Sequence, residues 1–258
     1  MKIFSAVATT ILLVAVGATA QTTNTLSDAE IQGRALAQKI LEQQPAENFT
    51  NTGVLQIRDG NGHHAEIPVK CKTIVTSADW RQIYEADLTS HPATFFVIHA
   101  QSQSNAYFYR TNLAESVPLL GDIPLLGHLF RSHQMSSAEL ASPFAGSDFW
   151  LCDLGLEFFH WPEQKVLKKE VHRSCGCTVL ESTNPNPTTN GYSRVVSWID
   201  NDSLGIVEAY AYDANGKKLK DFYPKDLKKV DGQYQVQSMI MENLQTGSKT
   251  RLEFDLKK

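Results

Sequence analysis

"TRLEFDL", residues 250–256, shows the pattern that decides how this chain folds. Three apolar side chains alternate in it with three charged ones: Leu252, Phe254 and Leu256 with Arg251, Glu253 and Asp255. Successive side chains of a β-strand point to opposite faces of a sheet, so this strand has one apolar and one charged face. The pattern favours an antiparallel sheet, which can have one face on a core and the other in water.

The same period of two recurs over most of the chain. Residues 51–75, "NTGVLQIRDGNGHHAEIPVKCKTIV", predict two strands around a Gly-Asn-Gly turn, with five side chains on one face: Ile67, Val69, Cys71, Thr73 and Val75. Further strands are predicted in residues 80–87, 93–101, 105–111, 165–173, 177–182, 192–200, 205–214, 218–226, 227–243 and 248–258. A sheet of about ten or more strands usually curls or closes, so helices or a ligand must fill its apolar hollow.

Two stretches break this period and predict helices. "SDAEIQGRALAQKILEQQP", residues 27–45, begins with Ser27 and Glu30 in a capping box and has a stripe at helical spacing, Ile31, Ala35, Leu36 and Ile40. We expect a helix over residues 28–44, ended by Pro45. The Trp-rich stretch "GSDFWLCDLGLEFFHWPEQ", residues 146–164, predicts a central helical segment, in which Ser147 or Asp148 suits a helix start and Asp148 and Asp153 orient the segment.

Composition and the N-terminus predict an exported globular protein. Of the 258 residues, 42% are apolar and 20% charged, which is ordinary for a soluble domain. The net charge of −4 gives no reason to expect nucleic acid. Lys2, an apolar run and the small residues "ATA" indicate a signal peptide over residues 1–20, cleaved before Gln21. Composition does not change along residues 21–258, so we expect one domain there.

Four cysteines, Cys71, Cys152, Cys175 and Cys177, therefore lie in a protein that can hold disulfides. Cys175 and Cys177 are two apart in a predicted strand, which places them on one face and poorly for bonding each other. If two bridges form, each joins Cys71 or Cys152 to one of this pair. Four free buried thiols are the alternative, and no spacing typical of a metal site is visible.

"VPLLGDIPLLGHLFR", residues 117–131, resembles the signature of secretins, the outer-membrane gates of bacterial secretion systems. The resemblance covers about 15 residues, and a secretin needs a much longer chain. Its prolines and glycines forbid a long regular element, so we interpret residues 117–145 as an apolar loop insert. The alternative is that residues 117–131 contact a secretin.

Four motifs in the second half carry a more extensive resemblance. "GSDFWLCDL", "YSRVVSWID", "GKKLKDF" and "ENLQTGSKTRLEF" lie in this order within residues 146–256. Together they resemble the outer-membrane lipoprotein-sorting family, the LolA-like half-barrels. This implies a mainly β (α+β) fold: one curved antiparallel sheet forms an incomplete barrel, which the N-terminal helix and the central helical and loop insert cover. It also implies a periplasmic carrier of lipid or lipoprotein acyl chains, which an inner-membrane transporter loads and an outer-membrane receptor unloads.

A carrier needs an apolar cavity and a polar exterior. Candidate residues for the cavity or its lid are Phe95, Val97, Phe149, Trp150, Phe158, Phe159, Val196 and Trp198. We expect a monomer without cofactor, metal or catalytic residues. Two other functions stay open: an accessory of a secretion system that contacts a secretin through residues 117–131, and a secreted hydrolase. The sequence has no GxSxG, HExxH or phosphate-binding loop for the latter.

The Lys-rich stretch "KKLKDFYPKDLKK", residues 217–229, has six Lys and two Asp. Two interpretations are open: a basic surface for anionic lipid head groups, or the solvated face of a hairpin.

Overall fold

A computed structural model describes the chain except for residues 1–25, 89–92, 101–103, 111–134, 231–232 and 257–258. The predicted signal peptide and the secretin-like residues 117–131 both lie outside the described residues. The description therefore begins just before the first predicted helix.

The described residues form one sheet of 12 strands. In chain order these are β1 Phe49–Arg58, β2 His64–Val75, β3 Asp79–Ala86, β4 Ala93–Ala100, β5 Ala106–Arg110, β6 Glu163–His172, β7 Cys175–Thr183, β8 Arg194–Asp200, β9 Ile206–Tyr212, β10 Lys218–Val230, β11 Gln233–Asn243 and β12 Ser248–Phe254. Their order in the sheet is β5-β4-β3-β2-β1-β12-β11-β10-β9-β8-β7-β6.

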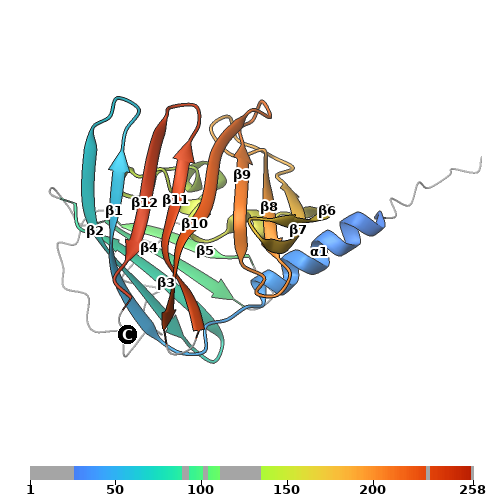
Figure 1. The fold of residues 1–258 in the computed structure, drawn as a ribbon, viewed down its shortest axis with the longest axis horizontal. Coiled ribbons are helices and arrows are strands. Elements are labelled where there is room, and N and C mark those ends of the chain that lie inside the picture. Colours follow the sequence, from blue (N-terminus) through green and yellow to red (C-terminus); the bar gives the residue numbers. More distant parts are fainter. Residues whose placement is uncertain (1–25, 89–92, 101–103, 111–134, 231–232, 257–258) are drawn as a thin grey trace, which may run out of the picture.

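Every pair of neighbouring strands is antiparallel. Pairing of β1 with β12 joins the first and last parts of the chain, while β5 and β6 stay at the two edges. The sheet curves strongly without closing (Figure 1). The predicted fold, a single curved antiparallel sheet that forms an incomplete barrel, is confirmed.

The N-terminal helix α1, Asp28–Leu41, packs against β6 at one end of the sheet (Figure 1). Its predicted capping box is confirmed: the Ser27 side chain accepts from the Glu30 backbone, and the Glu30 side chain accepts from the Ser27 backbone. The helix ends three residues before the predicted position 44, because the chain turns towards β1.

The buried face of α1 differs from the predicted stripe. Gly33, Ala37 and Ile40 are buried, whereas Ile31 is 53% exposed and Ala35 is exposed. A Cβ atom on Gly33 would lie 2.5 Å from the backbone nitrogen of Lys165 in β6. The helix therefore contacts the strand through its smallest residue, which hydrophobic spacing does not indicate.

The central segment forms short helices instead of one long helix. It consists of α3 Ser137–Leu140, the 3₁₀ helix η2 Phe144–Gly146, α4 Leu151–Leu154 and the 3₁₀ helix η3 Glu157–His160. It lies inside the curve of the sheet, where it covers part of the concave face (Figure 1). Leu140, Phe144 and Ala145, from the described end of the predicted insert, are buried in the core.

One strand boundary was predicted wrongly. Residues 218–226 and 227–243 were expected as two strands that meet at Asp226, but β10 runs through to Val230. Irregular pairing with β11 occurs on both sides of Asp226, just after Pro224. Proline has no N–H for the ladder, so a bulge accommodates it without ending the strand.

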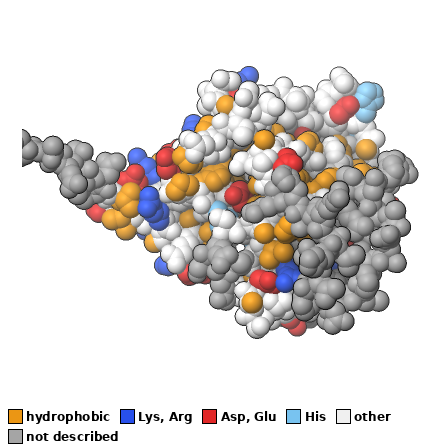
Figure 2. Space-filling model, turned by 180° about the vertical axis from the view of Figure 1, so that it is seen from behind, with side chains coloured by type: hydrophobic (Ala, Val, Ile, Leu, Met, Phe, Trp, Pro, Cys, Tyr) orange, Lys and Arg blue, Asp and Glu red, His pale blue; other side chains and the backbone are white. Residues whose placement is uncertain are grey.

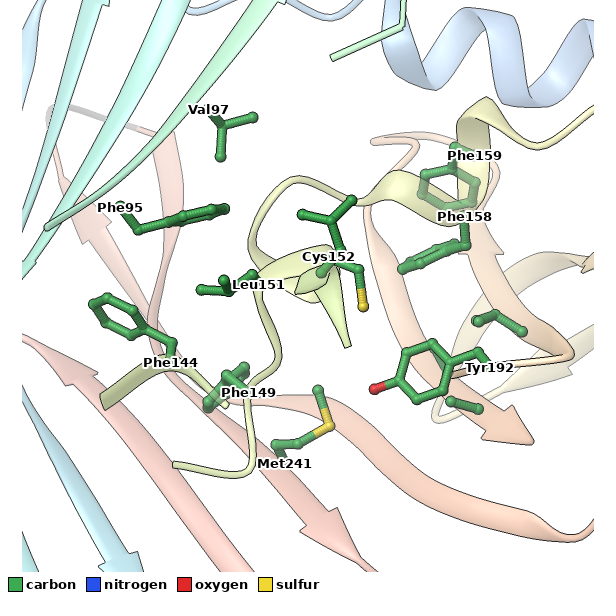
Figure 3. Packing of buried hydrophobic residues seen from close by; sticks show 14 of the residues in the cluster. Phe95, Val97, Phe144, Phe149, Leu151, Cys152, Phe158, Phe159, Tyr192 and Met241 are labelled. Carbon is green, nitrogen blue, oxygen red and sulfur yellow. The ribbon is translucent and has the colours of Figure 1, made fainter. Parts of the chain in front are cut away.

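The core lies between the central segment and the concave face. Figure 3 shows Leu151 and Phe144 of the central segment beside Phe95, which comes from β4. On the other side of the segment, Cys152 and Phe158 lie towards Tyr192 (Figure 3). The central segment therefore fills one part of the hollow and leaves the rest open.

Candidate functional site

A cavity of about 1100 Å³ occupies the open part of the hollow. It lies between the end of α1, the segment from Phe149 to Phe158, and the concave faces of β1–β4 and β8–β12. Ordinary ligand pockets span about 300–1,000 Å³, so this cavity is at or above the upper end of that range.

Apolar side chains from β9 to β12 form one wall of the cavity. The predicted alternation of β12 is confirmed, since Leu252, Phe254 and Leu256 all line it while Arg251 forms ion pairs with Asp226 and Glu253. The neighbouring strands add further apolar lining residues: Ala209, Ala211, Phe222, Met239 and Met241. Alternation within each strand thus gives the sheet an apolar concave face and a charged convex face.

A buried ion pair joins the central segment to this wall. Lys220 is 1% exposed, and its Nζ donates to the carbonyl oxygen of Asp148 at 2.6 Å and to Oδ2 of Asp153 at 3.3 Å. The same Nζ lies 3.7 Å from the ring centroid of Trp150. Burial lowers the pKa of Lys220, and the carboxylate of Asp153 opposes that shift.

A β-bulge turns Lys220 into the hollow. Lys218 pairs with Tyr212 and Lys220 with Ala211, so Leu219 is an extra residue in β10. Lys218 therefore lies on the convex face, with Nζ 3.1 Å from the Tyr210 ring centroid. Without the bulge, Lys218 and Lys220 would share a face.

Asp153 also orients the central segment, as predicted. Its Oδ2 accepts from the Trp150 backbone N–H at 2.8 Å and from the Tyr192 hydroxyl at 3.1 Å. Trp150, and not Ser147 or Asp148, is the N-cap residue of α4. Asp148 instead accepts from Thr250 and Ser248 of β12, which ties the start of the segment to the sheet.

The opposite side of the cavity, on β3 and β4, is more polar. Trp80 and His99 line it with stacked rings whose centroids lie 3.8 Å apart, and His99 Nε2 is 3.3 Å from Oε1 of Gln82. Burial lowers the pKa of His99 to about 4, so its imidazole is neutral near pH 7.

We place the mouth of the cavity where β1 begins and β12 ends, because the lining residues Phe49, Gln235 and Asp255 are exposed there. Phe49 lines this region together with Phe254 at the end of β12 and with Asp255 and Leu256 just after it. Val230 and Gln235, from the ends of β10 and β11, line it as well. Figure 2, which shows the molecule from the side opposite to Figure 1, shows a band of hydrophobic side chains from α1 towards the middle of the molecule.

The eight predicted site residues divide into four groups, three of which lie on the concave side of the sheet. Phe149 and Phe158 line the cavity. Phe95, Val97 and Phe159 are buried in the core, where Phe95 and Val97 face the central segment (Figure 3). Trp150 stacks on Tyr192, with ring centroids 4.6 Å apart, behind the cavity wall.

Val196 and Trp198 lie on the other face of the sheet, which corrects their assignment to the cavity. Their neighbour Val195 lines the cavity instead. Trp198 donates to Glu170 at 2.7 Å and contacts the rings of His172 and Tyr210 on the convex face. Val195, Val196 and Ser197 are all apolar or small. The sequence therefore does not show whether the odd-numbered or the even-numbered residues of this strand face the cavity.

All four cysteines are free in the structure. Cys71 lines the cavity, and burial raises its pKa to about 12. Cys152 lies in the central core, whereas Cys175 and Cys177 lie at the start of β7, which six strands separate from β2 in the sheet order. The pairing of Cys71 or Cys152 with Cys175 or Cys177 stays a prediction that these positions do not support.

Sequence reasoning missed Lys220 and Tyr192 as parts of the site. The available signal was the co-occurrence of "GSDFWLCDL" and "GKKLKDF", because a lysine predicted inside a strand needs a partner when it is buried. The carboxylate that supplies this partner, Asp153, comes from the first motif. Among the described residues, no three His, Cys, Asp or Glu side chains gather as a metal site requires.

Solved structures with the same fold cover nearly the whole chain. A DUF1329 family protein from Desulfovibrio piger has a TM-score of 0.68 at 20% identity, over 89% of this chain and 92% of its own. A putative outer membrane lipoprotein-sorting protein domain from Vibrio parahaemolyticus has 0.66 at 19%, over 88% and 92%. A LolA superfamily protein from Nitrosomonas europaea has 0.57 at 13%, over 89% and 93%. The LolA-like resemblance is thereby confirmed for the fold.

A family model described as "Uncharacterized protein" matches residues 126–257, just over half of the chain. The chain belongs to this family. The match begins before the central segment and includes every strand from β6 to β12, and hence the Lys220 pair and the apolar wall. A search of curated proteins found no significant match.

Proposed function

We propose that this protein is a periplasmic carrier, without catalysis, that holds the acyl chains of a lipid or lipoprotein in the cavity and transports them towards the outer membrane. The single observation that carries the proposal is the cavity of about 1100 Å³ in the concave face, with its wall of apolar side chains. Each methylene that leaves water for such a site contributes about 0.8 kcal/mol, so a long chain binds strongly without any specific polar contact.

The charges around the cavity support an apolar cargo. Lys220 and Asp153 pair with each other in its wall, and the imidazole of His99 is neutral near pH 7. A charged group of the ligand that entered the cavity beside Lys220 would have to displace its partner Asp153, at a cost of several kcal/mol. The apolar part of an amphiphile therefore fits inside, with its charged part at the mouth.

The convex face supports a carrier that stays in water when it is loaded. Salt bridges cover β10 to β12 on this side, among them Lys249 with Glu242 and Arg251 with Asp226. No described helix has the length and apolar character needed to cross a bilayer. Because the acyl chain enters an existing hollow, loading does not require apolar surface to become exposed.

The similarity of the fold supports the proposed transport towards the outer membrane. One protein of the same fold is named as a putative outer membrane lipoprotein-sorting domain. A donor transporter and an acceptor receptor are the partners that this function requires. The secretin contact through residues 117–131 depends on a segment outside the described residues and stays a prediction.

The proposal is tested by native mass spectrometry of the mature protein, purified gently from its own periplasm. We expect a discrete added mass that dissociates as a lipid or lipopeptide. Binding of a fluorescent fatty acid is then compared between the unmodified protein and Ala209→Phe, which fills the cavity at a residue that is 5% exposed. Removal of space for about five methylenes should weaken binding more than a hundredfold.

Val171→Phe is the matched control, because Val171 is 78% exposed on β6 and receives the same ring outside the cavity. Binding by this variant should equal that of the unmodified protein. A clean mass of the apo protein, together with no uptake of added fatty acid, would refute the carrier function.

A further inference from the structure

An exposed patch of alternating lysine and apolar side chains lies on the β10–β11 hairpin. Lys225, Leu227 and Lys229 are exposed residues at the end of β10, and Leu227 is 59% exposed. Tyr234 of β11 pairs with Lys229 and is 73% exposed, with Lys229 Nζ 5.9 Å from its ring centroid. We call these four residues the rim patch.

The rim patch is continuous with the mouth of the cavity. Val230 and Gln235, from the same two strand ends, line the cavity. Lys228, between Leu227 and Lys229, donates from Nζ to the carbonyl oxygen of Leu256, another lining residue. In Figure 1 these ends of β10 and β11 lie at the lower side of the view, near the connection from α1 to β1.

Phe49 extends this apolar surface across the mouth. It begins β1, lines the cavity and is 41% exposed. Leu227, Tyr234 and Phe49 are thus large apolar side chains, in contact with water, at the strand ends beside the cavity. Scattered exposed apolar residues are common, but a group at the entrance of an apolar cavity marks an interaction surface.

The patch itself carries the two positive charges of Lys225 and Lys229, although the chain has a net charge of −4. The nearby carboxylate of Asp226 already accepts from Ser238 and forms an ion pair with Arg251. Lys225 and Lys229 form no ion pair among the described residues. The two lysines are therefore available to an anionic surface.

The side-chain types fit a membrane interface. Tyrosine places its ring among acyl chains and its hydroxyl at the head groups, and lysine extends its charge outwards while its stem lies on apolar surface. Leucine supplies buried area. A protein partner would also accept apolar residues, but the pairing of exposed lysines with Leu227 and Tyr234 matches anionic lipid head groups above hydrocarbon.

We propose that the rim patch docks the mouth of the cavity onto a membrane surface that contains anionic lipids. Docking in this orientation places the opening at the level of the acyl chains, so a lipid moves between membrane and cavity without crossing water. Exchange of lipid in the docked state rests on the proposed carrier function, whereas docking itself does not.

The experiment is co-sedimentation of the mature protein with vesicles of phosphatidylcholine, with and without 30% phosphatidylglycerol. We expect binding to the anionic vesicles only, and we expect 0.5 M salt to weaken it because the Debye length becomes shorter. Lys225→Glu with Lys229→Glu should reduce the affinity at least 25-fold, from about fivefold per lost lysine. Leu227→Ser with Tyr234→Ser should reduce it at least tenfold at both salt concentrations.

Controls of the same chemistry lie on β6 and α1, at the other end of the sheet order from β5. Lys169→Glu with Lys39→Glu changes the net charge equally, and Leu167→Ser with Val171→Ser removes two apolar residues that are 44% and 78% exposed. Both control variants should bind vesicles within twofold of the unmodified protein. Equal loss in control and rim variants would overturn the proposal, because it would show a dependence on overall charge or hydrophobicity.

Fatty-acid binding without vesicles separates this proposal from the carrier function. Rim variants should take up fluorescent fatty acid normally and fail only to sediment with vesicles. Failure of the unmodified protein to bind anionic vesicles overturns the docking proposal even where fatty-acid uptake is normal. A concentration-dependent dimer that the Leu227 and Tyr234 substitutions abolish would also overturn it, in favour of self-association.

Discussion

His99 shows how one buried side chain couples the cavity to pH. Its ring stacks on Trp80 and lies beside Oε1 of Gln82, and Asn105 also forms a hydrogen bond with it. Burial also lowers the pKa of the nearby His160. No carboxylate that would stabilise a charged imidazole is among the groups that shift the pKa of His99. Burial consequently lowers the pKa of His99 from 6.5 to about 4.

We predict that this histidine reduces stability in acid. Between pH 6.5 and about 4 the unfolded chain binds a proton that native His99 does not, so the free energy of unfolding falls as the pH decreases through this window. The full shift corresponds to about 3 kcal/mol. Urea unfolding from pH 7.5 to 4 should show that His99→Gln loses less stability than the unmodified protein; parallel curves would contradict the prediction.

The Lys220 pair illustrates what residue-scale reasoning can recover from sequence. Lys220 lies between Leu219 and Asp221 in a predicted strand. In a regular strand it would share a face with Lys218 and point outwards. The bulge at Leu219 depends on pairing with β9 and reverses that assignment. The orienting role of Asp153 was therefore predictable from the sequence, but its ion pair with Lys220 was not.

At the scale of elements, Gly33 determines how α1 sits on the sheet. Gly33→Ala increases helix propensity by about 1 kcal/mol, but the new Cβ atom would lie within 2.6 Å of the Gln164 and Lys165 backbone. Backbone cannot move aside as a flexible side chain does. We predict a net destabilisation of about 1–3 kcal/mol, the usual range for overpacking.

Chemical denaturation measures this effect, with Gln32→Ala as its control on the exposed side of the same helix. The control should be neutral or slightly stabilising, because only propensity changes there. If Gly33→Ala proved as stable as Gln32→Ala, close packing of α1 on β6 would not determine the position of the helix.

Elements were predicted where their signal is local. The capping box of α1 and the alternation of β12 depend on residues within a few positions of each other, and both are confirmed. The buried face of α1 and the inward parity of β8 depend on contacts with distant strands. Val195, Val196 and Ser197 are compatible with either parity, so only the register with β7 and β9 fixes it.

For the whole molecule, the fold class followed from repeated alternation, and the four motifs added the half-barrel architecture. An apolar hollow was expected, but its shape did not follow from the sequence, because that shape depends on how far the central segment fills the curve of the sheet. Phe149 and Phe158 line the cavity while Phe159, adjacent in sequence, packs into the core. Aromatic composition predicts that such residues are buried but not which of them meet a ligand.

The size of the whole cavity determines how affinity should depend on the length of the acyl chain. Affinity for saturated fatty acids should rise about fourfold with each added methylene while the chain still enters the cavity, from about 0.8 kcal/mol per group. Once the cavity is full, further methylenes stay in water and the affinity should stop rising. Isothermal titration across a series of chain lengths, with a negative heat-capacity change as the sign of apolar burial, measures both regimes.

Ala211→Phe places a ring in the wall of this cavity at a residue that is 7% exposed. It should therefore move the plateau to shorter chains and leave the slope below the plateau unchanged, since the remaining walls stay apolar. A uniform loss of affinity at every chain length would instead mean that the substitution disrupts the fold. An affinity independent of chain length in the unmodified protein would place binding at the surface and not in the hollow.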